Sequence, residues 1–516
     1  MQRDKATVSM RNITKTFGSV LANEHVNLDI YKGEILALLG ENGSGKTTLM
    51  NILSGIYFPD TGHIRVNGQE VSIRSPKDVY RLGIGMVHQH FKLVNVLTAA
   101  ENIILGMPGK GKLDLKAVGE QILKICNLYG FDINPEQKVY DMSVSQKQTV
   151  EIVKVLYRGA DILILDEPTA VLTPQETEKL FCVLRNLRKD GKAIVIITHK
   201  LHEVEEISDR VAVLRRGVNV GELATKDTNA AEMTNMMVGH AVSLNIARPE
   251  PKDPQPRLVV DHLTVKDADG VVRLADVSFT ANSGEVLGIA GISGCGQKEL
   301  LESIAGLEPL EQGSIRYIRP EDGKEFDLAG MNPREIFDLG VKLSFVPEDR
   351  LGMGLVGNMD LTNNMMLRSF RNGKSVFTDR KSPRNLAHRV VSELEVNTPG
   401  LTIPVRKLSG GNVQKVLVGR EISSSPTVLM TAYAVRGLDI NSSYTIYHLI
   451  NKQKEKGAAV IFVGEDLDVL LELCDRILVL CDGRISGIVP GVGADKNEIG
   501  LMMTSHGGDK SHDSNS

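Results

Sequence analysis

Gly40-Glu41-Asn42-Gly43-Ser44-Gly45-Lys46-Thr47 is the stretch that decides the fold of this chain. It has the pattern G-x-x-x-x-G-K-[ST], in which glycines allow backbone N–H groups to surround a phosphate. Lys46 adds a positive charge, and Thr47 offers its hydroxyl to Mg²⁺. An apolar run at residues 35–39 leads into the loop, and a helical pattern at 48–53 follows it. This order of strand, glycine-rich turn and helix predicts a phosphate loop within an α/β domain.

A pair of acidic residues follows another apolar run in the same half of the chain. Residues 162–165 read Ile-Leu-Ile-Leu, and Asp166 and Glu167 come directly after them. We expect Asp166 to hold Mg²⁺ through water, and Glu167 to accept a proton from the attacking water. His199 ends the next apolar run, and the strand order places it beside the two acids. An acidic pair can also cap a helix and a lone histidine can be structural, but the phosphate loop in the same domain favours catalysis.

The second half of the chain repeats the first with altered residues. Its counterpart of the phosphate loop is Gly291-Ile292-Ser293-Gly294-Cys295-Gly296-Gln297-Lys298, where Gln297 stands in place of the lysine. Further landmarks share one spacing of 266 residues (409 − 143, 465 − 199, 475 − 209), namely Ser143 with Ser409, His199 with Glu465 and Asp209 with Asp475. A constant spacing over so long a stretch indicates a duplication.

The duplication suggests the domain organisation. We expect a first domain at residues 1–245, a linker at 246–256, a second domain at 257–505 and a disordered tail at 506–516. The linker has four prolines within eight residues, which exclude a helix or a central strand and predict a stiff, extended segment. Strand-length and helical runs alternate within each copy, and the stretch at about 97–158 is mainly helical. This pattern predicts an α/β fold with a largely parallel core sheet and a helical subdomain.

Composition indicates a globular protein of several domains and excludes other classes. An apolar fraction of 42% with 24% charged residues is ordinary, and 516 residues are too many for one core. The net charge of −4, with both signs interspersed, gives no electrostatic footprint for nucleic acid. Five widely spaced cysteines form neither a zinc pattern nor a disulfide framework, which is typical of a reducing cytosol. No apolar run approaches the roughly 20 residues that span a bilayer, and no signal peptide is visible, so we expect at most a peripheral role at a membrane.

Together these motifs resemble those of the ATP-binding cassette (ABC) family, along roughly residues 7–500. Phe17 lies where the family stacks an aromatic ring on adenine, and Gln89 lies at the family's Q-loop, which contacts Mg²⁺ and senses the membrane partner. The family's signature motif occurs in the second copy as Leu408-Ser409-Gly410-Gly411-Asn412, whereas the first copy has Met142-Ser143-Val144-Ser145-Gln146. The resemblance implies two tandem P-loop NTPase domains, each with a mainly parallel core sheet, an antiparallel β part and a helical subdomain.

The resemblance also implies an active site shared between two modules. In this family each ATP is held by the phosphate loop of one module and by the signature of the other, whose amides cap the γ-phosphate at a helix N-terminus. The implied catalytic residues are Glu167, His199 and Lys46, and the implied Mg²⁺ ligands are Thr47, Gln89 and Asp166. The residues implied in ATP binding are Phe17, Gly40, Glu41, Asn42, Gly43, Ser44, Gly45, Lys46, Thr47, Thr48, Gln89, Ser409, Gly410, Gly411 and Asn412.

The second composite site lacks most of these groups. The replacements are Gln297 and Lys298 in the phosphate loop, Glu348 at the Q-loop, Ala432 and Tyr433 for the two acids, Glu465 for the histidine and Ala268 for the aromatic ring. Its signature carries Ser145, whose β-carbon lies where a phosphate approaches bare backbone. We expect no productive Mg²⁺–ATP there, so the second copy is either a structural partner or a nucleotide binder without turnover. Cys295 is either a redox switch or a simple small-residue replacement.

A fused tandem with a degenerate second copy resembles the carbohydrate-uptake class of bacterial importers, and residues 86–93 and 160–174 resemble its nucleoside branch. This class implies an ATPase at the cytoplasmic face of the membrane, bound to polytopic permease subunits and served by a substrate-binding lipoprotein or periplasmic receptor. Ser145, Thr149 and residues 433–435 depart from the family pattern. The alternatives are an ATPase for another small solute of the same class, a soluble tandem ABC protein of the ribosome or DNA-repair type, and a non-hydrolysing scaffold. The intact first site argues against the scaffold.

Overall fold

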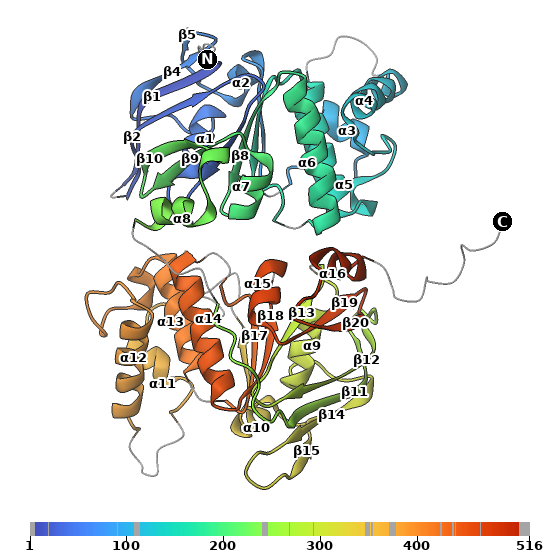
Figure 1. Ribbon diagram of the computed structural model, residues 1–516, viewed down its shortest axis with the longest axis vertical. Helices are drawn as coiled ribbons and strands as arrows, with labels where there is room; N and C mark the ends of the chain where they lie inside the picture. Colours follow the sequence, from blue (N-terminus) through green and yellow to red (C-terminus); the bar gives the residue numbers. More distant parts are fainter. Residues whose placement is uncertain are drawn as a thin grey trace, which may run out of the picture. The chain divides into compact units, whose positions relative to one another are not determined.

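Two compact units divide the chain between Ser243 and Leu244, and each contains a six-stranded and a four-stranded sheet (Figure 1). The computed structural model describes residues 6–18, 20–89, 91–107, 114–170, 172–239, 246–267, 269–292, 294–345, 351, 354–370, 378–423, 426–435, 438, 440–464 and 466–504. The predicted tail and positions 268, 348 and 465 of the degenerate site lie outside these residues.

The larger sheet of the first unit has the strand order β10-β9-β3-β8-β7-β6. All neighbouring strands are parallel except β9 and β10. Strands β3 and β7 are buried at every residue, because helices pack on both faces of the sheet. The bounds are β3 Ile35–Leu39, β6 Ile84–Val87, β7 Ile162–Asp166, β8 Ala193–Thr198, β9 Arg210–Arg215 and β10 Val218–Ala224.

An antiparallel sheet with the order β2-β1-β4-β5 shares a hydrophobic core with one face of the larger sheet. Its strands are β1 Val8–Phe17, β2 Val20–Ile30, β4 Thr61–Val66 and β5 Gln69–Val71. The helices of the unit are α1 Lys46–Leu53, α2 Pro76–Arg81, α3 Ala99–Ile104, α4 Leu115–Tyr129, α5 Val144–Tyr157, α6 Pro174–Lys189, α7 Leu201–Ile207 and α8 Ala230–Val238. The predicted parallel core, antiparallel part and helical subdomain are therefore all present.

Helices α3, α4 and α5 form the subdomain around a core of their own. Each begins at a residue whose side chain accepts a hydrogen bond from the first turn, namely Thr98, Asp114 and Ser143. Helix α4 ends at Gly130, whose left-handed backbone is the usual stop for a helix. Local capping therefore sets the ends of these helices, and their apolar faces set the packing.

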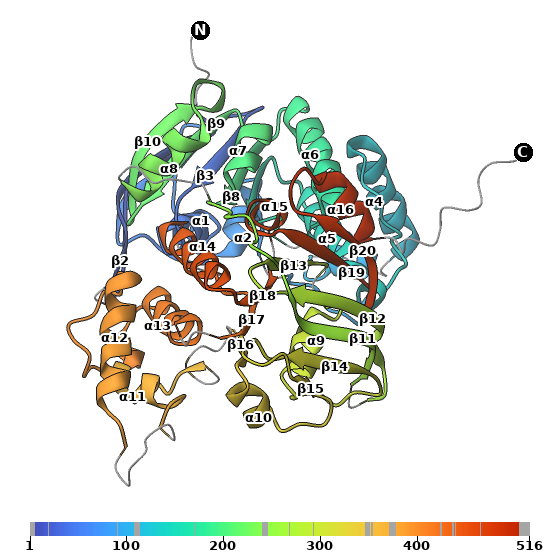
Figure 2. The same ribbon diagram turned by 60° about the horizontal axis from the view of Figure 1, so that its bottom comes forward.

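The second unit repeats this architecture (Figure 2). Its larger sheet has the order β16-β17-β18-β13-β19-β20, and its smaller sheet has the order β12-β11-β14-β15. The strands are β11 Pro256–Lys266, β12 Val272–Asn282, β13 Val286–Ala290, β14 Gln312–Ile318, β15 Glu325–Asp327, β16 Val341–Phe345, β17 Val428–Ala432, β18 Ala459–Val463, β19 Arg476–Cys481 and β20 Arg484–Pro490. The helices are α9 Gln297–Ile304, α10 Pro333–Asp338, α11 Leu361–Met366, α12 Lys381–Glu393, α13 Gly410–Ile422, α14 Ile440–Glu455, α15 Leu467–Leu473 and α16 Lys496–Met502. No helix in the described ranges is both long and apolar enough to cross a membrane.

The two copies share their unusual backbone conformations as well as their strand order. Glu167 and Tyr433 both have a positive φ, 46° and 56°, directly after corresponding strands. Arg216 and Asp482 form a second such pair, with φ of 49° and 45°. Non-glycine residues rarely adopt this conformation. Its recurrence at matched positions therefore supports the duplication independently of the sequence spacing.

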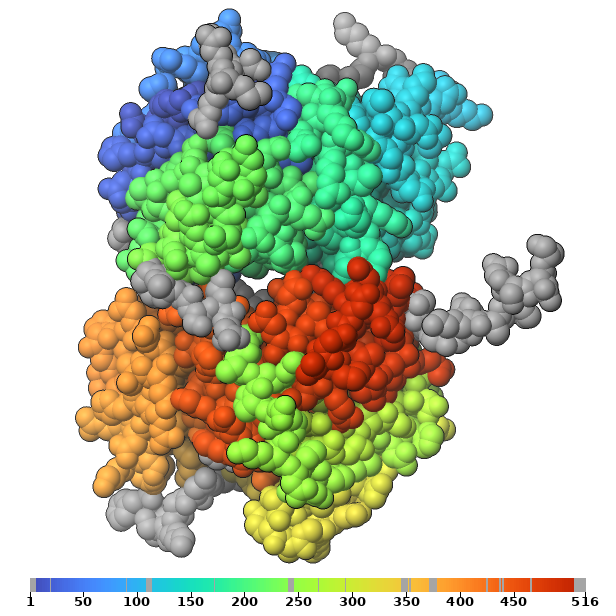
Figure 3. All heavy atoms as spheres, in the orientation of Figure 1, coloured from blue at the N-terminus to red at the C-terminus, as the bar shows by residue number. Residues whose placement is uncertain are grey.

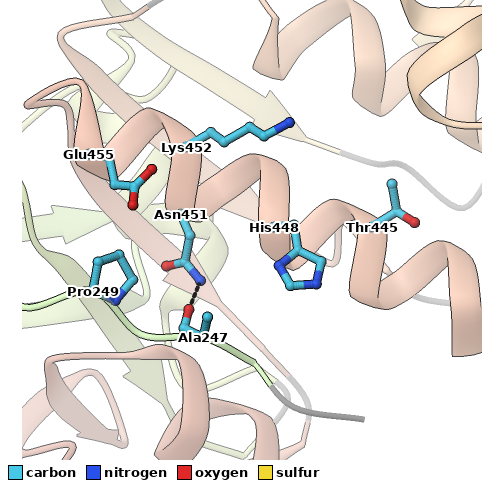
Figure 4. Close-up of a pocket in the computed structure, with 7 residues that line it drawn as sticks. All are labelled: Ala247, Pro249, Thr445, His448, Asn451, Lys452 and Glu455. Atoms are coloured by element: carbon cyan, nitrogen blue, oxygen red, sulfur yellow. Dashed lines mark hydrogen bonds between the residues drawn. The ribbon is translucent and has the colours of Figure 1, made fainter. Parts of the chain in front are cut away.

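The proline-rich segment belongs structurally to the second unit. Figure 3 shows its atoms against the second unit, and Figure 4 shows Asn451 of α14 donating a hydrogen bond to the carbonyl oxygen of Ala247. Arg248 Nη1 donates to the carbonyl oxygens of Leu471 and Cys474, at 2.9 and 2.8 Å. An open cavity of about 450 Å³ separates this segment from α14, and none of the predicted site residues line it.

The expectation that these prolines exclude a central strand is wrong at one position. Pro256 is the first residue of β11, which lies between β12 and β14 in the smaller sheet. A proline is tolerated at the first position of a strand, because no hydrogen bond between strands requires its missing N–H there.

Candidate active site

The phosphate loop connects β3 to α1 and depends on glycine at two positions. Gly43 and Gly45 have φ of 79° and 98°, which glycine adopts without strain. A β-carbon at Gly45 would lie 2.3 Å from the carbonyl oxygen of Ala22 and 2.6 Å from Asn23 Nδ2. The loop is therefore held tightly against β2, and position 45 accepts glycine alone.

Lys46 is the first residue of α1, and its ammonium group points into the loop. Its Nζ donates hydrogen bonds to the carbonyl oxygens of Gly40 and Glu41, at 2.7 and 2.9 Å. Burial lowers the pKa of Lys46, and the nearby carboxylates of Glu167 and Asp166 oppose that shift. The arrangement holds a buried positive charge at the centre of a ring of backbone groups.

Asp166 ends β7, and Thr47 lies in the first turn of α1. Burial raises the pKa of Asp166 to about 6, and the neighbouring carboxylate of Glu167 adds to the shift. The Thr47 hydroxyl and the charge of Lys46 oppose this rise in pKa. The carboxylate of Asp166 is therefore close enough to the start of α1 to be affected by both side chains.

Glu167 is held by two side chains from neighbouring strands. Its Oε1 lies 2.9 Å from His199 Nδ1, and its Oε2 accepts a hydrogen bond from Gln89 Nε2 at 3.1 Å. Burial would raise the pKa of Glu167, but the hydrogen bond and charge of His199, with Lys46 and Lys200, lower it overall. Gln89, Glu167 and His199 follow the adjacent parallel strands β6, β7 and β8, so their side chains meet at one edge of the sheet.

A buried carboxylate behind this edge was not predicted from the sequence. Glu203 of α7 is 2% exposed and accepts hydrogen bonds from the hydroxyls of Thr169 and Thr198. Lys200 Nζ lies 3.1 Å from Glu203 Oε1 and also donates to the carbonyl oxygen of Thr169. This network ties the segment after Glu167 to the segment that carries His199. In the sequence, only the short distance along the chain between His199 and Glu203 indicated that Glu203 could belong to the site.

Phe17 ends β1 and is 43% exposed. Its ring meets the ring of Tyr57 edge to face, with centroids 5.1 Å apart and an interplanar angle of 71°. Lys15 Nζ lies over the Phe17 ring, 5.4 Å from the centroid. The predicted nucleobase residue therefore has an aromatic neighbour that the sequence did not indicate.

The two signature segments differ in how their serines are used. In the first copy Ser143 Oγ accepts a hydrogen bond from the backbone N–H of Gln146, which caps α5. In the second copy Ser409 Oγ makes no such capping bond and instead accepts one from Asn412 Nδ2, at 2.8 Å. A β-carbon at Gly411 would meet no atom within 4 Å, so the start of α13 is open in front of its backbone. These residues belong to the second unit, separate from the unit that carries Lys46.

The counterpart of the phosphate loop in the second copy has a neutral side chain at the position of the buried lysine. Gln297 is buried, and its Nε2 donates to the carbonyl oxygen of Ile292 at 3.0 Å, much as Lys46 donates within its own loop. Lys298, which stands at the position of Thr47, is exposed, and its Nζ lies 3.7 Å from Glu302 Oε1 of the same helix. Ala432 and Tyr433 follow the path of Asp166 and Glu167 without a carboxylate.

Comparisons with known proteins agree with this architecture. The family described as "ABC transporter" matches residues 23–170 and 274–431. The guanosine import ATP-binding protein NupO of Bacillus subtilis is 42% identical over 503 residues, which cover 96% of this chain and 97% of that protein. The nucleoside import ATP-binding protein NupA of Lactococcus lactis is 41% identical over 507 residues, with 97% and 98% covered. The ribose import ATP-binding protein RbsA 1 of Streptomyces avermitilis is 39% identical over 490 residues, with 94% and 91% covered.

Among solved structures, the ADP conformation of MJ1267, an ATP-binding cassette of an ABC transporter, aligns with a TM-score of 0.42 at 25% identity. It covers 46% of this chain and 100% of that structure. The family match covers both copies, and the sequence relatives extend along nearly the whole chain. The chain therefore belongs to the ABC transporter family, as an ATP-hydrolysing subunit with two tandem ATPase domains.

Proposed function

We propose that this chain energises an importer for nucleosides or simple sugars from one competent ATP site. The observation that carries the proposal is the carboxylate of Glu167, held between His199 and Gln89 beside a complete phosphate loop. The proposed cargo follows from these relatives, whose names describe guanosine, nucleoside and ribose import. An ATPase for another small solute of the same class, and a tandem ABC ATPase without a transport role, are the alternatives.

The proposed roles follow from charge and position. The lowered pKa of Glu167 keeps it ionised near neutral pH, so it can accept a proton from a water that attacks the γ-phosphate. His199 orients Glu167 and the γ-phosphate, and Lys46 places its charge on the phosphates. The backbone of residues 40–48 surrounds the phosphates, and Phe17 stacks on the base.

The donor set at the mouth of the loop fits Mg²⁺. The Thr47 hydroxyl and the Asp166 carboxylate are hard oxygen ligands, Thr47 influences the pKa of Asp166, and the Gln89 amide follows the adjacent strand. Thr47, Asp166 and Gln89 would hold the ion, directly or through water. When bound, Mg²⁺ neutralises charge on the phosphates.

The remaining part of the site is proposed to come from the second copy. The amides at the start of α13, with Ser409, Gly410, Gly411 and Asn412, cap the γ-phosphate of the ATP held by the first copy. Ser409 Oγ accepts its bond from Asn412, so it keeps its own proton to donate to a phosphate oxygen. The second copy, with Gln297 and Ala432, contributes this signature without an active site of its own.

The transport role sets the proposed partners. The chain acts at the cytoplasmic face of the membrane by binding polytopic permease subunits, and a lipoprotein or periplasmic receptor delivers the cargo to them. We propose no nucleic acid as a partner of this chain. We propose the two ATPase domains at residues 1–245 and 257–505, with residues 246–256 joining them in the sequence while packing on the second unit.

The deciding experiment compares the two copies by mutation. Glu167→Gln should lower steady-state ATP hydrolysis by about 10²–10⁴-fold, because it removes a positioned base and keeps the shape of the side chain. Gln297→Ala, in the corresponding loop of the second copy, should change the rate less than about twofold, because no reacting group contacts it. A Gln297→Ala chain as inactive as Glu167→Gln would contradict a single competent site.

A further inference from the structure

The turn after α1 carries Tyr57 to Phe17. Helix α1 starts at Lys46 in the phosphate loop and ends at a turn in which the N–H groups of Ile56 and Tyr57 both donate to the carbonyl oxygen of Asn51, at 2.9 and 3.1 Å. Tyr57 is 37% exposed, and its ring packs edge to face on Phe17. One short helix thus links the phosphate loop to the ring proposed to bind the base.

An ion pair fixes the strand end beneath these rings. Lys15 Nζ donates to Asp60 at 2.8 Å, and Asp60 also accepts bonds from the N–H and the hydroxyl of Thr16, both at 2.7 Å. Asp60 N donates to the carbonyl oxygen of Thr14 at 2.8 Å. Polar contacts therefore join the end of β1 to the turn that follows α1, in addition to the contact between the two rings.

The second copy keeps the ion pair and the turn of this corner but has no aromatic residue at either ring position, which makes it an internal control. Lys266 lies 2.8 Å from Glu311, at the positions of Lys15 and Asp60, and Glu311 N donates to Thr264 O at 2.9 Å. The turn is kept, since Leu307 N donates to the carbonyl oxygen of Glu302 at 2.8 Å. The residue at the position of Tyr57 is Glu308. The ion pair and the turn therefore form without the aromatic pair.

We infer that Tyr57 is a positioning residue for nucleotide binding, which acts by holding the Phe17 ring in place for the base. The inference rests on the proposed function, in which Phe17 stacks on the base of ATP. The aromatic pair occurs in the copy with a complete phosphate loop, whereas the ion pair and the turn occur in both. A ring held edge to face by Tyr57, with Lys15 over one face, loses less conformational freedom when a base stacks on its other face.

The test uses the full-length chain and compares ATP with tripolyphosphate, which has no base. Tyr57→Ala and Tyr57→Leu should raise the KM for ATP by about 2–10-fold, the range expected for one aromatic pair, with kcat unchanged. Their inhibition constants for tripolyphosphate should stay at the value of the unmutated chain. Tyr57→Phe keeps the ring and should behave like the unmutated chain. Phe58→Ala, at an exposed neighbouring ring, is the matched control and should have no effect.

A double-mutant cycle separates positioning from direct contact. If Tyr57 acts through Phe17, the KM of the Phe17→Ala/Tyr57→Ala chain should equal that of Phe17→Ala alone. The chain has no tryptophan, so a Phe17→Trp variant gives a unique fluorophore at this position. Its anisotropy without nucleotide should fall when Tyr57→Ala is added, because the ring then moves freely.

Each contrary result has a distinct meaning. An unchanged KM in Phe17→Ala would contradict the proposed role of Phe17 itself. A raised KM in Phe17→Ala with an unchanged KM in Tyr57→Ala and Tyr57→Leu would overturn the inference alone. Additive effects in the double variant, or a matching loss of tripolyphosphate binding, would show that Tyr57 contacts the base directly or supports the phosphate loop, and would also overturn it.

Discussion

Asp166 and Glu167 are neighbours in the chain with opposite shifts in pKa. Burial raises the pKa of Asp166 to about 6, whereas His199 and nearby lysines outweigh burial and lower that of Glu167. Adjacent carboxyl groups whose environments differ in this way suit different roles. The shifts support different roles for the two residues. Asp166 suits a metal ligand, because a neighbouring cation would stabilise its charged form. Glu167 suits a general base, because it is already ionised.

The raised pKa of Asp166 predicts how stability depends on pH. A carboxyl group with a raised pKa in the folded state binds more protons folded than unfolded. Its stabilising contribution is complete below about pH 4 and is lost as the pH rises through about 6, so at pH 7.5 the charged side chain destabilises the fold. In the absence of nucleotide, Asp166→Asn should therefore stabilise the first unit at pH 7.5, by about 1–3 kcal/mol.

Thermal unfolding at pH 7.5 and pH 5.0 measures this effect, because most Asp166 side chains are protonated at pH 5.0 and the gain should shrink there. An equal gain at both pH values would show that the substitution acts through packing. The same variant should lose ATP hydrolysis, which separates stability from activity at one residue.

At the scale of an element, the two phosphate loops are the same structure with different side chains. Helices α1 and α9 both follow a glycine in the left-handed conformation, Gly45 with φ of 98° and Gly296 with φ of 102°. Lys46 and Gln297 both fill their loops with a hydrogen bond to a loop carbonyl. The glycines therefore set the backbone conformation of each loop, and the residue that follows sets whether the loop holds a positive charge.

Gly45→Ala should destabilise the first unit by about 1–3 kcal/mol and abolish ATP binding, since the new β-carbon would meet the backbone of β2 in a strained conformation. Gly43→Ala is the matched control, because a β-carbon there meets nothing within 4 Å and only the backbone strain of roughly 1 kcal/mol remains. Urea titration and nucleotide binding give the two readouts. Equal effects at both positions would mean that the close contact with β2 is unimportant.

Gly296→Ala extends the comparison to the second copy. Its β-carbon would lie 2.5 Å from Leu274 Cδ2 and 2.9 Å from the carbonyl oxygen of Arg273. It should lower the unfolding midpoint of the second unit while ATP hydrolysis per folded molecule is kept. Loss of activity at a temperature where both units are folded would indicate that the degenerate loop takes part in turnover.

At the scale of the whole molecule, the boundary between the units decides how the chain can be divided. Ile246 is buried in the core of the second unit, and Arg248 is bonded to the backbone at the end of α15. The proline-rich segment therefore stabilises the second unit in addition to joining the two. Fragments are best cut between Ser243 and Leu244.

Residues 1–243 alone should bind ATP and hydrolyse it slowly, because the proposed signature lies in the other fragment. Addition of residues 244–504 should restore hydrolysis, whereas the same fragment with Ser409→Ala should restore it less, through loss of a hydroxyl donor. A fragment of residues 257–504, which lacks Ile246 and Arg248, should unfold at a lower temperature. Full activity of residues 1–243 alone would contradict a site completed by the second copy.

The sequence by itself determined much of the fold. The predicted runs at 35–39 and 162–165 match β3 and β7, and the helical run at 48–53 lies within α1, because apolar periodicity is a local signal. The meeting of His199 with Glu167 was predicted from strand order, since both follow parallel strands that end at one edge, whereas Gln89 was implied by the family resemblance alone.

Only the tertiary structure decided the properties that depend on burial and on distant contacts. The contact between Phe17 and Tyr57 needs both the end of β1 and the turn after α1, and neither residue carries a local signal for the other. The opposite pKa shifts of the neighbours Asp166 and Glu167 also depend on tertiary structure, because burial raises the pKa of Asp166 whereas His199 and lysines from other segments outweigh burial at Glu167. The exposed Lys298 lies 3.7 Å from Glu302, one turn along its own helix, which was not predicted from the sequence. A pattern along the chain fixes which element a residue joins, whereas the partners that set its charge and position are fixed by the packing of those elements.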